Sequence, residues 1–380
     1  MRLLKMKLNE LLLFEGGIEL DFVAQQRVTE LNDEGLTHIK GNVYRQNVLG
    51  IIGINASGKT TVLKILSFIF DLYLKQGKLN GEQYSFLANE QSFTIEAYFH
   101  FNDNQLMKIE SIVTRNPYNQ LVFQEEKIWK KTINKVKKSL YSFTDKDLQA
   151  IRTEENSPYL ADDMSMIIAY MKNQQPLDII DLISETNKNV MKKAGRIPLQ
   201  MVGFLDKSID YLYEEKDSNN HLMIRLKFKG QDNEIYLNNH QHLEAYLSSG
   251  TIKGLNVLTA VEKVFKSGGV LLIDEIENHF NKEIVRTIVN FFKSERTNPQ
   301  GATLVFTTHY SELLDDFERN DSIYLSLKED KLRFNNLNDL LNRSDFKKSE
   351  VYQSSYVGTT APSYDAYMEL KKYFQQVHKE

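Results

Sequence analysis

The chain has 380 residues, a formal net charge of −4 and no cysteine. This length allows one large domain or two of ordinary size, and an apolar fraction of 41% supports a packed core. The lack of cysteine excludes disulfides, thiolate metal sites and cysteine nucleophiles, and the charge excludes attraction of nucleic acid to the whole surface. No segment resembles a signal peptide or a transmembrane span, so we expect a cytoplasmic protein without a membrane partner.

Strand-like patterns open the chain. Residues 2–8 and 18–23 alternate apolar and polar side chains, as strands with one buried face do. NVLGIIGIN, at Asn47–Asn55, is an apolar run that ends in a glycine turn, which indicates a central strand buried on both faces. Helical spacing follows from Thr60, so the pattern predicts a strand, a turn and an amphipathic helix in succession.

The next segments predict an antiparallel meander and then a helical region. SFTIEAYFHF, LMKIESIVTR and QLVFQEEKI are short strand-like runs separated by turn residues. Between residues 127 and 218 strand signals fade, and two stretches with helical spacing follow Pro176 and Pro198. We therefore predict a helical insertion at 127–218.

Strands alternate with helices in the last third of the chain. GGVLLIDE, a helix from about Asn281, ATLVFTTH, another helix and DSIYLSL follow one another, which implies a mostly parallel sheet. The predicted fold class is α/β, with a mostly parallel central sheet, an antiparallel meander and the helical insertion. Residues 1–126 and 219–345 are predicted to form two halves of one domain, and 346–380 a helical tail.

GINASGKT, at Gly53–Thr60, fits the pattern G-x-x-x-x-G-K-[ST] between a buried strand and a helix. Glycines let successive N–H groups converge on an anion, and the helix start adds the positive end of its dipole. Lys59 is placed to reach the β- and γ-phosphates of ATP, and Thr60 to offer a hydroxyl to Mg²⁺. An ordinary turn is the alternative interpretation. The predicted binding residues are Gly53, Ile54, Asn55, Ala56, Ser57, Gly58, Lys59, Thr60 and Thr61.

Two further strand ends carry candidate catalytic groups. The apolar run in GGVLLIDEIEN ends in two carboxylates, of which Asp274 is expected to hold Mg²⁺ and Glu275 to act as general base or water positioner. The run LVFTTH delivers His309 to the same edge. A lone histidine is more often structural, but after an acidic pair we interpret His309 as a sensor of the γ-phosphate.

A second glycine-containing helix start lies about 190 residues further along the chain. YLSSGTIKGLN offers free N–H groups, the hydroxyls of Ser248 and Ser249, and Gly250, but no lysine. A serine N-cap is the simpler interpretation. If this helix start lay next to the phosphate-binding loop Gly53–Thr60 of the same chain (the cradle), a second phosphate site there would be redundant. We therefore expect it to close on the ATP of a second copy related by a twofold axis.

In this order GINASGKT, LSSGT, LLIDEIEN and TTH resemble the ABC-type P-loop ATPases, in the soluble branch of SMC, RecF and OLD-like proteins. LSSGT, LLIDEIENHF and TTHYSELLD are most similar to the AAA-labelled ATPases of bacterial abortive-infection and anti-phage systems. The resemblance covers about 1–125 and 220–345.

The resemblance implies roles for particular residues. Ser248 and Gly250 are expected to contact the opposing γ-phosphate, His309 to be the switch histidine, and IENHF to cross the dimer interface. LSSGT corresponds to the signature motif of the family, and Ser249 departs from that motif because the family has glycine at this position. The family's Mg²⁺-sensing glutamine has two candidates here, Gln91 and Gln124.

These features predict a Mg²⁺-dependent ATP hydrolase that acts as a switch, as a homodimer or a higher oligomer of dimers. The chain carries no zinc pattern and no paired nuclease carboxylates, so we expect a separate effector protein; a role in defence follows from the resemblance alone. The alternative is a DNA-binding repair-type clamp. KIWKKTINKVKK, at Lys127–Lys138, has six lysines around Trp129 and suits DNA or RNA, although a solvated helix face is the plainer interpretation.

Overall fold

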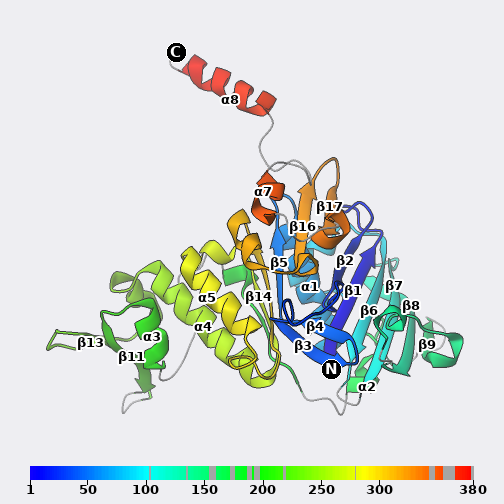
Figure 1. Ribbon diagram of the computed structural model, residues 1–380, viewed down its shortest axis with the longest axis horizontal. Helices are drawn as coiled ribbons and strands as arrows, with labels where there is room; N and C mark the ends of the chain where they lie inside the picture. The colour runs from blue at the N-terminus through cyan, green and yellow to red at the C-terminus, as the bar shows by residue number, and fades with distance from the viewer. Residues whose placement is uncertain are drawn as a thin grey trace.

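Two six-stranded sheets with one helix between them form the body of the protein (Figure 1). The computed structural model describes residues 1–101, 104–133, 136–153, 160–171, 176–185, 191, 197–216, 220–278, 280–341, 347–353 and 364–377. The helices are α1 (Lys59–Leu74), α2 (Ile168–Met171), α3 (Leu199–Leu205), α4 (Ser249–Ser267), α5 (Lys282–Lys293), α6 (Leu337–Leu340), α7 (Lys348–Gln353) and α8 (Tyr364–Val377).

The first sheet is mostly parallel, as the sequence predicts. Its first five strands run parallel and only the last, β17, is antiparallel to its neighbour. Residues of β5, β14 and β15 are buried on both faces, which explains their continuous apolar runs. In spatial order the strands are β10 (Ile179–Asp181), β14 (Val270–Ile273), β15 (Thr303–Thr308), β5 (Val48–Ile52), β16 (Ile323–Lys328) and β17 (Leu332–Asn336).

The second sheet is antiparallel and contains the predicted meander. The three predicted runs form β6, β7 and β8, and the N-terminal strands pair beside them. In spatial order its strands are β2 (Ile18–Asp21), β1 (Arg2–Asn9), β6 (Ser92–His100), β7 (Gln105–Arg115), β8 (Leu121–Thr132) and β9 (Leu148–Thr153). Two small antiparallel sheets comprise β3 (Leu36–Lys40) with β4 (Val43–Gln46), and β11 (Ile209–Lys216) with β12 (Leu222–Phe228) and β13 (Ile235–Leu237).

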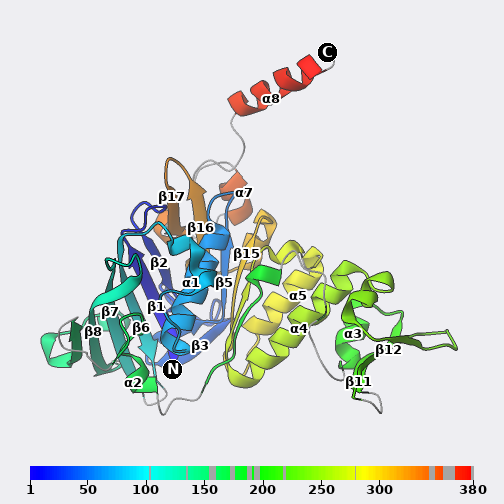
Figure 2. The ribbon, with the colours of Figure 1, turned by 180° about the vertical axis from the view of Figure 1, so that it is seen from behind.

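Helices cover the two faces of the parallel sheet differently. Apolar residues of α1 pack between the two sheets, against one face of the parallel sheet. Residues of α4 and α5 pack in a second core against its other face. Figure 2 shows α1 and the α4–α5 pair on separate sides of the sheet, with the β11–β13 sheet beyond α4. The starts of α1 and α4 therefore do not lie together in one chain.

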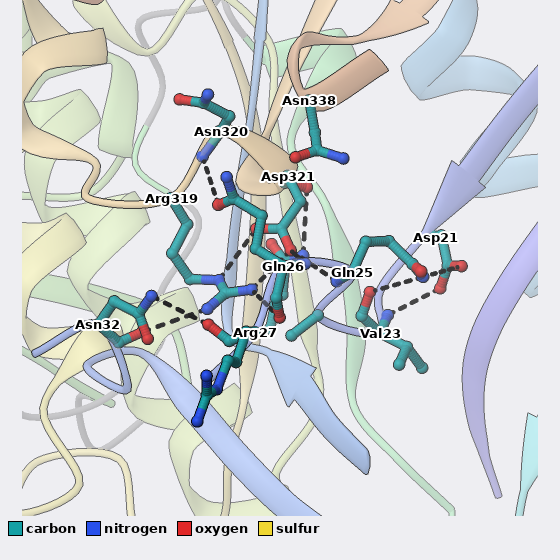
Figure 3. Close-up of polar contacts among 12 residues, drawn as sticks. Asp21, Val23, Gln25, Gln26, Arg27, Asn32, Arg319, Asn320, Asp321 and Asn338 are labelled. Atoms are coloured by element: carbon teal, nitrogen blue, oxygen red, sulfur yellow. Dashed lines mark hydrogen bonds and ion pairs between the residues drawn. The ribbon is translucent and has the colours of Figure 1, made fainter. Parts of the chain in front are cut away.

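A buried polar cluster ties the segment after β2 to the turn before β16 (Figure 3). The Asp321 carboxylate accepts hydrogen bonds from the backbone N–H groups of Gln25 (2.6 Å) and Gln26 (2.7 Å). It also pairs with the buried Arg319 guanidinium at 2.6 Å. Because the buried Asp321 carboxylate is neutralised by Arg319 and bonded to two backbone N–H groups, the cluster links the antiparallel sheet to the parallel sheet.

The region predicted as a helical insertion contains more strand than α-helix in its described residues. The boundary at 126/127 falls inside β8, and β10 joins the central sheet by pairing with β14. α3 begins after Pro198 as predicted but ends at Leu205, and residues 209–216 of the same predicted helix form β11. The segment after Pro176 forms β10 instead of a helix, and residues 186–190 and 192–196 of that stretch lie outside the described residues. A short apolar run such as Ile179–Ile180 has no period that separates a helix from a strand.

The two remaining predicted helices have different outcomes. The helix predicted after His309 is only a 3₁₀ turn, at Ser311–Asp316. The predicted C-terminal helix is present as α8 and lies apart from the body in both views (Figures 1 and 2). Among the described residues, none of the helices has the length and apolarity needed to cross a bilayer.

Candidate functional site

The loop between β5 and α1 has a backbone that requires glycine. Gly58 has φ 92°, in the left-handed region, and a Cβ at Gly53 would lie 2.3 Å from the Ser326 carbonyl oxygen. Ala56 is also left-handed, at φ 59°. Left-handed residues in such a turn aim successive N–H groups into one concavity, which is the geometry of an anion-binding nest. The loop thus fits the phosphate cradle that the motif predicts.

Lys59 lies over this loop. Its Nζ donates to the carbonyl oxygens of Gly53 (2.8 Å) and Ile54 (3.0 Å). Burial lowers the pKa of Lys59, while the nearby carboxylates of Glu275, Asp274 and Glu277 act in the opposite direction. The ammonium is therefore partly desolvated, which strengthens its attraction for a phosphate that enters the loop.

Thr60 and Asp274 lie together at the carboxyl edge of the parallel sheet. Thr60 Oγ1 donates to Asp274 Oδ2 at 2.7 Å, and Thr307 Oγ1 donates to Asp274 Oδ1 at the same distance. The three residues come from α1, from the end of β14 and from β15, whose parallel strands bring their ends to one edge. A hydroxyl and a carboxylate side by side are the hard oxygen ligands that Mg²⁺ prefers.

Glu275 has a strained backbone and a fixed side chain. Its φ is 46°, and its N–H donates to Thr307 Oγ1 at 2.7 Å. Asn278 Nδ2 donates to Glu275 Oε2 at 2.6 Å, which leaves Oε1 facing His309 Nε2 at 3.5 Å. About a third of the Glu275 side chain is exposed, so it reaches solvent at the edge where the candidate base is required.

His309 completes this group of side chains. Its Nδ1 lies 3.5 Å from Lys59 Nζ, and its backbone N–H donates to Glu277 Oε1 at 2.6 Å. The structure therefore brings together the predicted residues Lys59, Thr60, Asp274, Glu275 and His309.

The signature segment lies elsewhere in the same chain. Ser248 is the N-cap of α4, with its Oγ accepting from the Thr251 N–H at 3.1 Å, as the simpler interpretation predicts. Ser248, Ser249 and Gly250 are exposed, and a Cβ at Gly250 would meet only Ser248 Oγ, at 3.9 Å. The helix start is thus accessible, with room above it, and it does not line the cleft beside Thr60.

That cleft, of about 560 Å³, also contains residues that the sequence did not single out. The end of β10 contributes Asp181 and Ser184, and Gln83 lies in the lining, whereas the candidates Gln91 and Gln124 do not. Asp181 accepts from Ser67 Oγ of α1 at 2.5 Å. No pattern in the sequence pointed to Asp181 and Ser184, because the segment that contains β10 was predicted as a helix. The full lining is Thr60, Lys64, Ser67, Asp71, Gln83, Tyr84, Asp181, Ile183, Ser184, Asp274 and Glu275.

The lysine-rich segment lies largely in a strand, not in a helix. Lys127 pairs with Glu125, and the ammonium of Lys130 lies over the Phe101 ring at 5.6 Å. Lys131 donates to the Ser139 carbonyl (2.9 Å), and Lys137 donates to the Ala24 carbonyl (2.8 Å). Of the five lysines that the structure describes in this segment, four thus have contacts within the chain, whereas Lys135 lies outside the described residues.

The fold and the site define a P-loop ATPase of mixed α/β architecture. The chain belongs to the family described as "AAA domain, putative AbiEii toxin, Type IV TA system", whose model matches residues 48–315. The relationship predicted from the motifs is thereby confirmed.

One solved structure to which the chain is similar is titled "Structure of the recombination mediator protein RecF-ATP in RecFOR pathway". The identity is 15%, the match covers 86% of this chain and 97% of that chain, and the TM-score is 0.36. No curated protein matches the chain.

Proposed function

We propose that this protein hydrolyses ATP with Mg²⁺ and uses the cycle to associate and release two copies of itself. The observation that carries this proposal is the convergence of Lys59, Glu275 and His309 with the Thr60–Asp274 pair at one sheet edge. Each group has a task in phosphoryl transfer: Lys59 attracts the β- and γ-phosphates, Glu275 orients the attacking water, and His309 faces the γ-phosphate.

The residues present fit a magnesium ion. Among the described residues no group of three or more His, Cys, Asp or Glu side chains is arranged as a metal cage. One carboxylate and one hydroxyl, from Asp274 and Thr60, suit Mg²⁺, which is usually held by few protein oxygens together with phosphates and water. When bound there, the ion would neutralise charge that develops on the phosphate oxygens.

The second part of the proposal concerns association. Ser248, Ser249 and Gly250 stand exposed at the start of a 19-residue helix, on the other side of the sheet from α1. A helix start of this kind attracts anions, and the phosphate-binding loop of the same chain is out of its reach. A second copy in a twofold arrangement would supply the missing phosphate, so that two ATP molecules lie between two subunits.

We further propose a role in bacterial defence, in which the ATP-bound dimer controls a separate effector protein. The family description, which names a putative toxin of a Type IV TA system, supports the defence role only. The DNA-clamp alternative differs in predicting that DNA stimulates ATP hydrolysis. Four lysines of the candidate segment have internal contacts, which makes this segment a weaker candidate for the DNA-binding surface.

The association step is tested with Glu275→Gln. This change keeps the shape of the side chain and removes the base, so hydrolysis stops while ATP still binds. In saturating Mg-ATP, light scattering should show twice the 44.2 kDa of one chain. Gly250→Asp in the same background should bind ATP and stay monomeric, because it places a carboxylate against the second copy's phosphate.

Gly203→Asp is the matched control for the added charge. Gly203 is also helical, and a Cβ there would meet no atom within 4 Å, so this variant should still dimerise. A monomeric Glu275→Gln protein under these conditions would contradict the proposed association.

A further inference from the structure

A second glutamate, Glu277, lies in the turn that follows Glu275; the resemblance places its segment, IENHF, at the dimer interface but gives this side chain no task in catalysis. It belongs to the short 3₁₀ turn Ile276–Asn278. Its Oε1 accepts the backbone N–H of His309 at 2.6 Å. Its Oε2 is buried and has no hydrogen-bond partner among the residues that the structure describes. Burying one oxygen of a carboxylate without a partner is costly, so this residue calls for an explanation.

The His309 imidazole is not fixed by its own contacts. Its two ring nitrogens lie 3.5 Å from Lys59 Nζ and 3.5 Å from Glu275 Oε1, at the long limit for a hydrogen bond. The position of the ring must therefore come from the backbone that carries it.

His309 lies just beyond the end of a strand, so its backbone N–H is not part of the sheet. β15 ends at Thr308, whose last pairing is with Ile52 of β5. Beyond it, the His309 N–H bonds to Glu277, and the Tyr310 N–H bonds to Thr308 Oγ1 at 3.0 Å. A short hydrogen bond to a carboxylate is stronger than one to a neutral group, so Glu277 is the main restraint on residue 309.

The same turn also orients the candidate base. Asn278, the neighbour of Glu277, holds Glu275 Oε2 at 2.6 Å, and its N–H bonds to the Glu275 carbonyl at 2.8 Å. One turn of three residues thus contacts both groups expected at the γ-phosphate.

We propose that Glu277 is a positioning residue for ATP hydrolysis, which sets the distance between His309 and Glu275 by holding the backbone of His309. This inference rests on the proposed function, since it assigns importance to His309. In this proposal Glu277 acts on the reaction through residue 309 and not by direct contact with the phosphate.

Two conservative variants separate the hydrogen bond from the charge. Glu277→Gln keeps an oxygen that can accept from the His309 N–H and loses the charge. Glu277→Asp keeps the charge and, being one methylene shorter, loses the reach. We expect Glu277→Gln to keep kcat within a few-fold of the wild type. We expect Glu277→Asp and Glu277→Ala to lower kcat by about tenfold or more, with KM for ATP nearly unchanged.

A double-mutant cycle with His309→Ala completes the test. If Glu277 acts through His309, Glu277→Ala should cost nothing further in the His309→Ala background. Independent, multiplicative losses would overturn the inference, as would wild-type kcat in Glu277→Asp. A Glu277→Gln variant that loses ATP affinity instead of kcat would also overturn it, because the charge would then act on Lys59.

The failure of the proposed function gives a different pattern. If His309→Ala has wild-type kcat, the role proposed for His309 is wrong, and the inference about Glu277 falls with it. If His309→Ala lowers kcat but all Glu277 variants are fully active, only the inference is wrong. Thermal melting of each variant controls for folding, and the Gln and Asp pair decides the question if Glu277→Ala does not fold.

Discussion

At the residue scale, the site depends on side chains inside the motifs to which the motifs assign no task of their own. Thr307 is the clearest example, because its single hydroxyl donates to Asp274 Oδ1 and accepts from the Glu275 N–H. It thereby fixes the relative position of the proposed metal ligand and the proposed base. Thr307 is fully buried, so water cannot replace the lost contacts.

Thr307→Val should therefore impair catalysis more than binding. Valine has nearly the same shape but leaves the Glu275 N–H unpaired, which costs about 1–3 kcal/mol of stability. We expect kcat for ATP to fall by about tenfold or more, with a smaller change in nucleotide affinity. Thr307→Ser, which keeps the hydroxyl, should restore most of the rate in a steady-state phosphate-release assay. Equal rates for the valine and serine variants would show that the hydroxyl has no such role.

What the sequence predicts at this scale follows from adjacency along the chain. Lys59 and Thr60 stand inside one motif, and Asp274 and Glu275 end an apolar run, so their roles are visible as patterns. Thr307 and Glu277 act through hydrogen bonds to residues about 32 positions away, and no spacing rule connects them. They meet the site because the parallel strands β14, β15 and β5 end at the same edge of the sheet.

At the element scale, strands buried on both faces were predictable and short edge elements were not. β5, β14 and β15 are continuous apolar runs, and each lies where it was expected. β10 has three residues and pairs on one side only, so its pattern is too short to distinguish it from a helix. In the lysine-rich segment the many lysines made the alternating pattern of a strand hard to recognise. Ile128 is buried, whereas its neighbours Lys127 and Trp129 are not.

Asp21, the last residue of β2, makes the link between the sheets sensitive to pH. Its carboxylate accepts from the Val23 N–H (2.8 Å), from Tyr141 Oη (2.7 Å) and from Gln25 Nε2 (2.6 Å). Burial nevertheless raises the pKa of Asp21 from 3.8 to about 7. The folded state therefore binds this proton more tightly than the unfolded chain. The resulting stability is present below about pH 4 and is lost as pH rises towards 7.

Asp21→Asn removes this titration. Relative to the wild type, the variant should gain a few kcal/mol, at most about 4, in free energy of unfolding between pH 4 and pH 8. Its absolute stability also includes a constant loss from the altered hydrogen bonds, so the pH dependence of the difference is the informative quantity. Urea denaturation at a series of pH values measures it, with the exposed Asp33→Asn as control. Parallel curves for Asp21→Asn and the wild type would contradict this account of Asp21.

At the scale of the whole molecule, the two helix starts that we propose to bind phosphate belong to helices on different sides of one sheet. α1 packs in the core between the sheets, and α4 packs in the core on the far face. The sequence showed both helix starts but not their separation, which depends on which face of the sheet each helix covers. This separation gives the association proposal its central claim: each ATP is enclosed by the cradle of one copy and the signature of another.

Mixing two inactive variants tests that claim most directly. Lys59→Ala disables the cradle and Gly250→Asp disables the signature, so each protein alone should hydrolyse almost no ATP. A mixed dimer has one site with an intact cradle from the Gly250→Asp copy and an intact signature from the Lys59→Ala copy. The account predicts that an equimolar mixture recovers up to about a quarter of the wild-type rate, if copies pair at random.

The matched control is a mixture of Lys59→Ala with Glu275→Gln, both of which lie on the cradle side. Every site in that mixed dimer keeps one defect, so no activity should return. Recovery in the first mixture and none in the second is the predicted result of the phosphate-release assay. A first mixture that is no more active than its two components would contradict the shared sites on which the proposed switch depends.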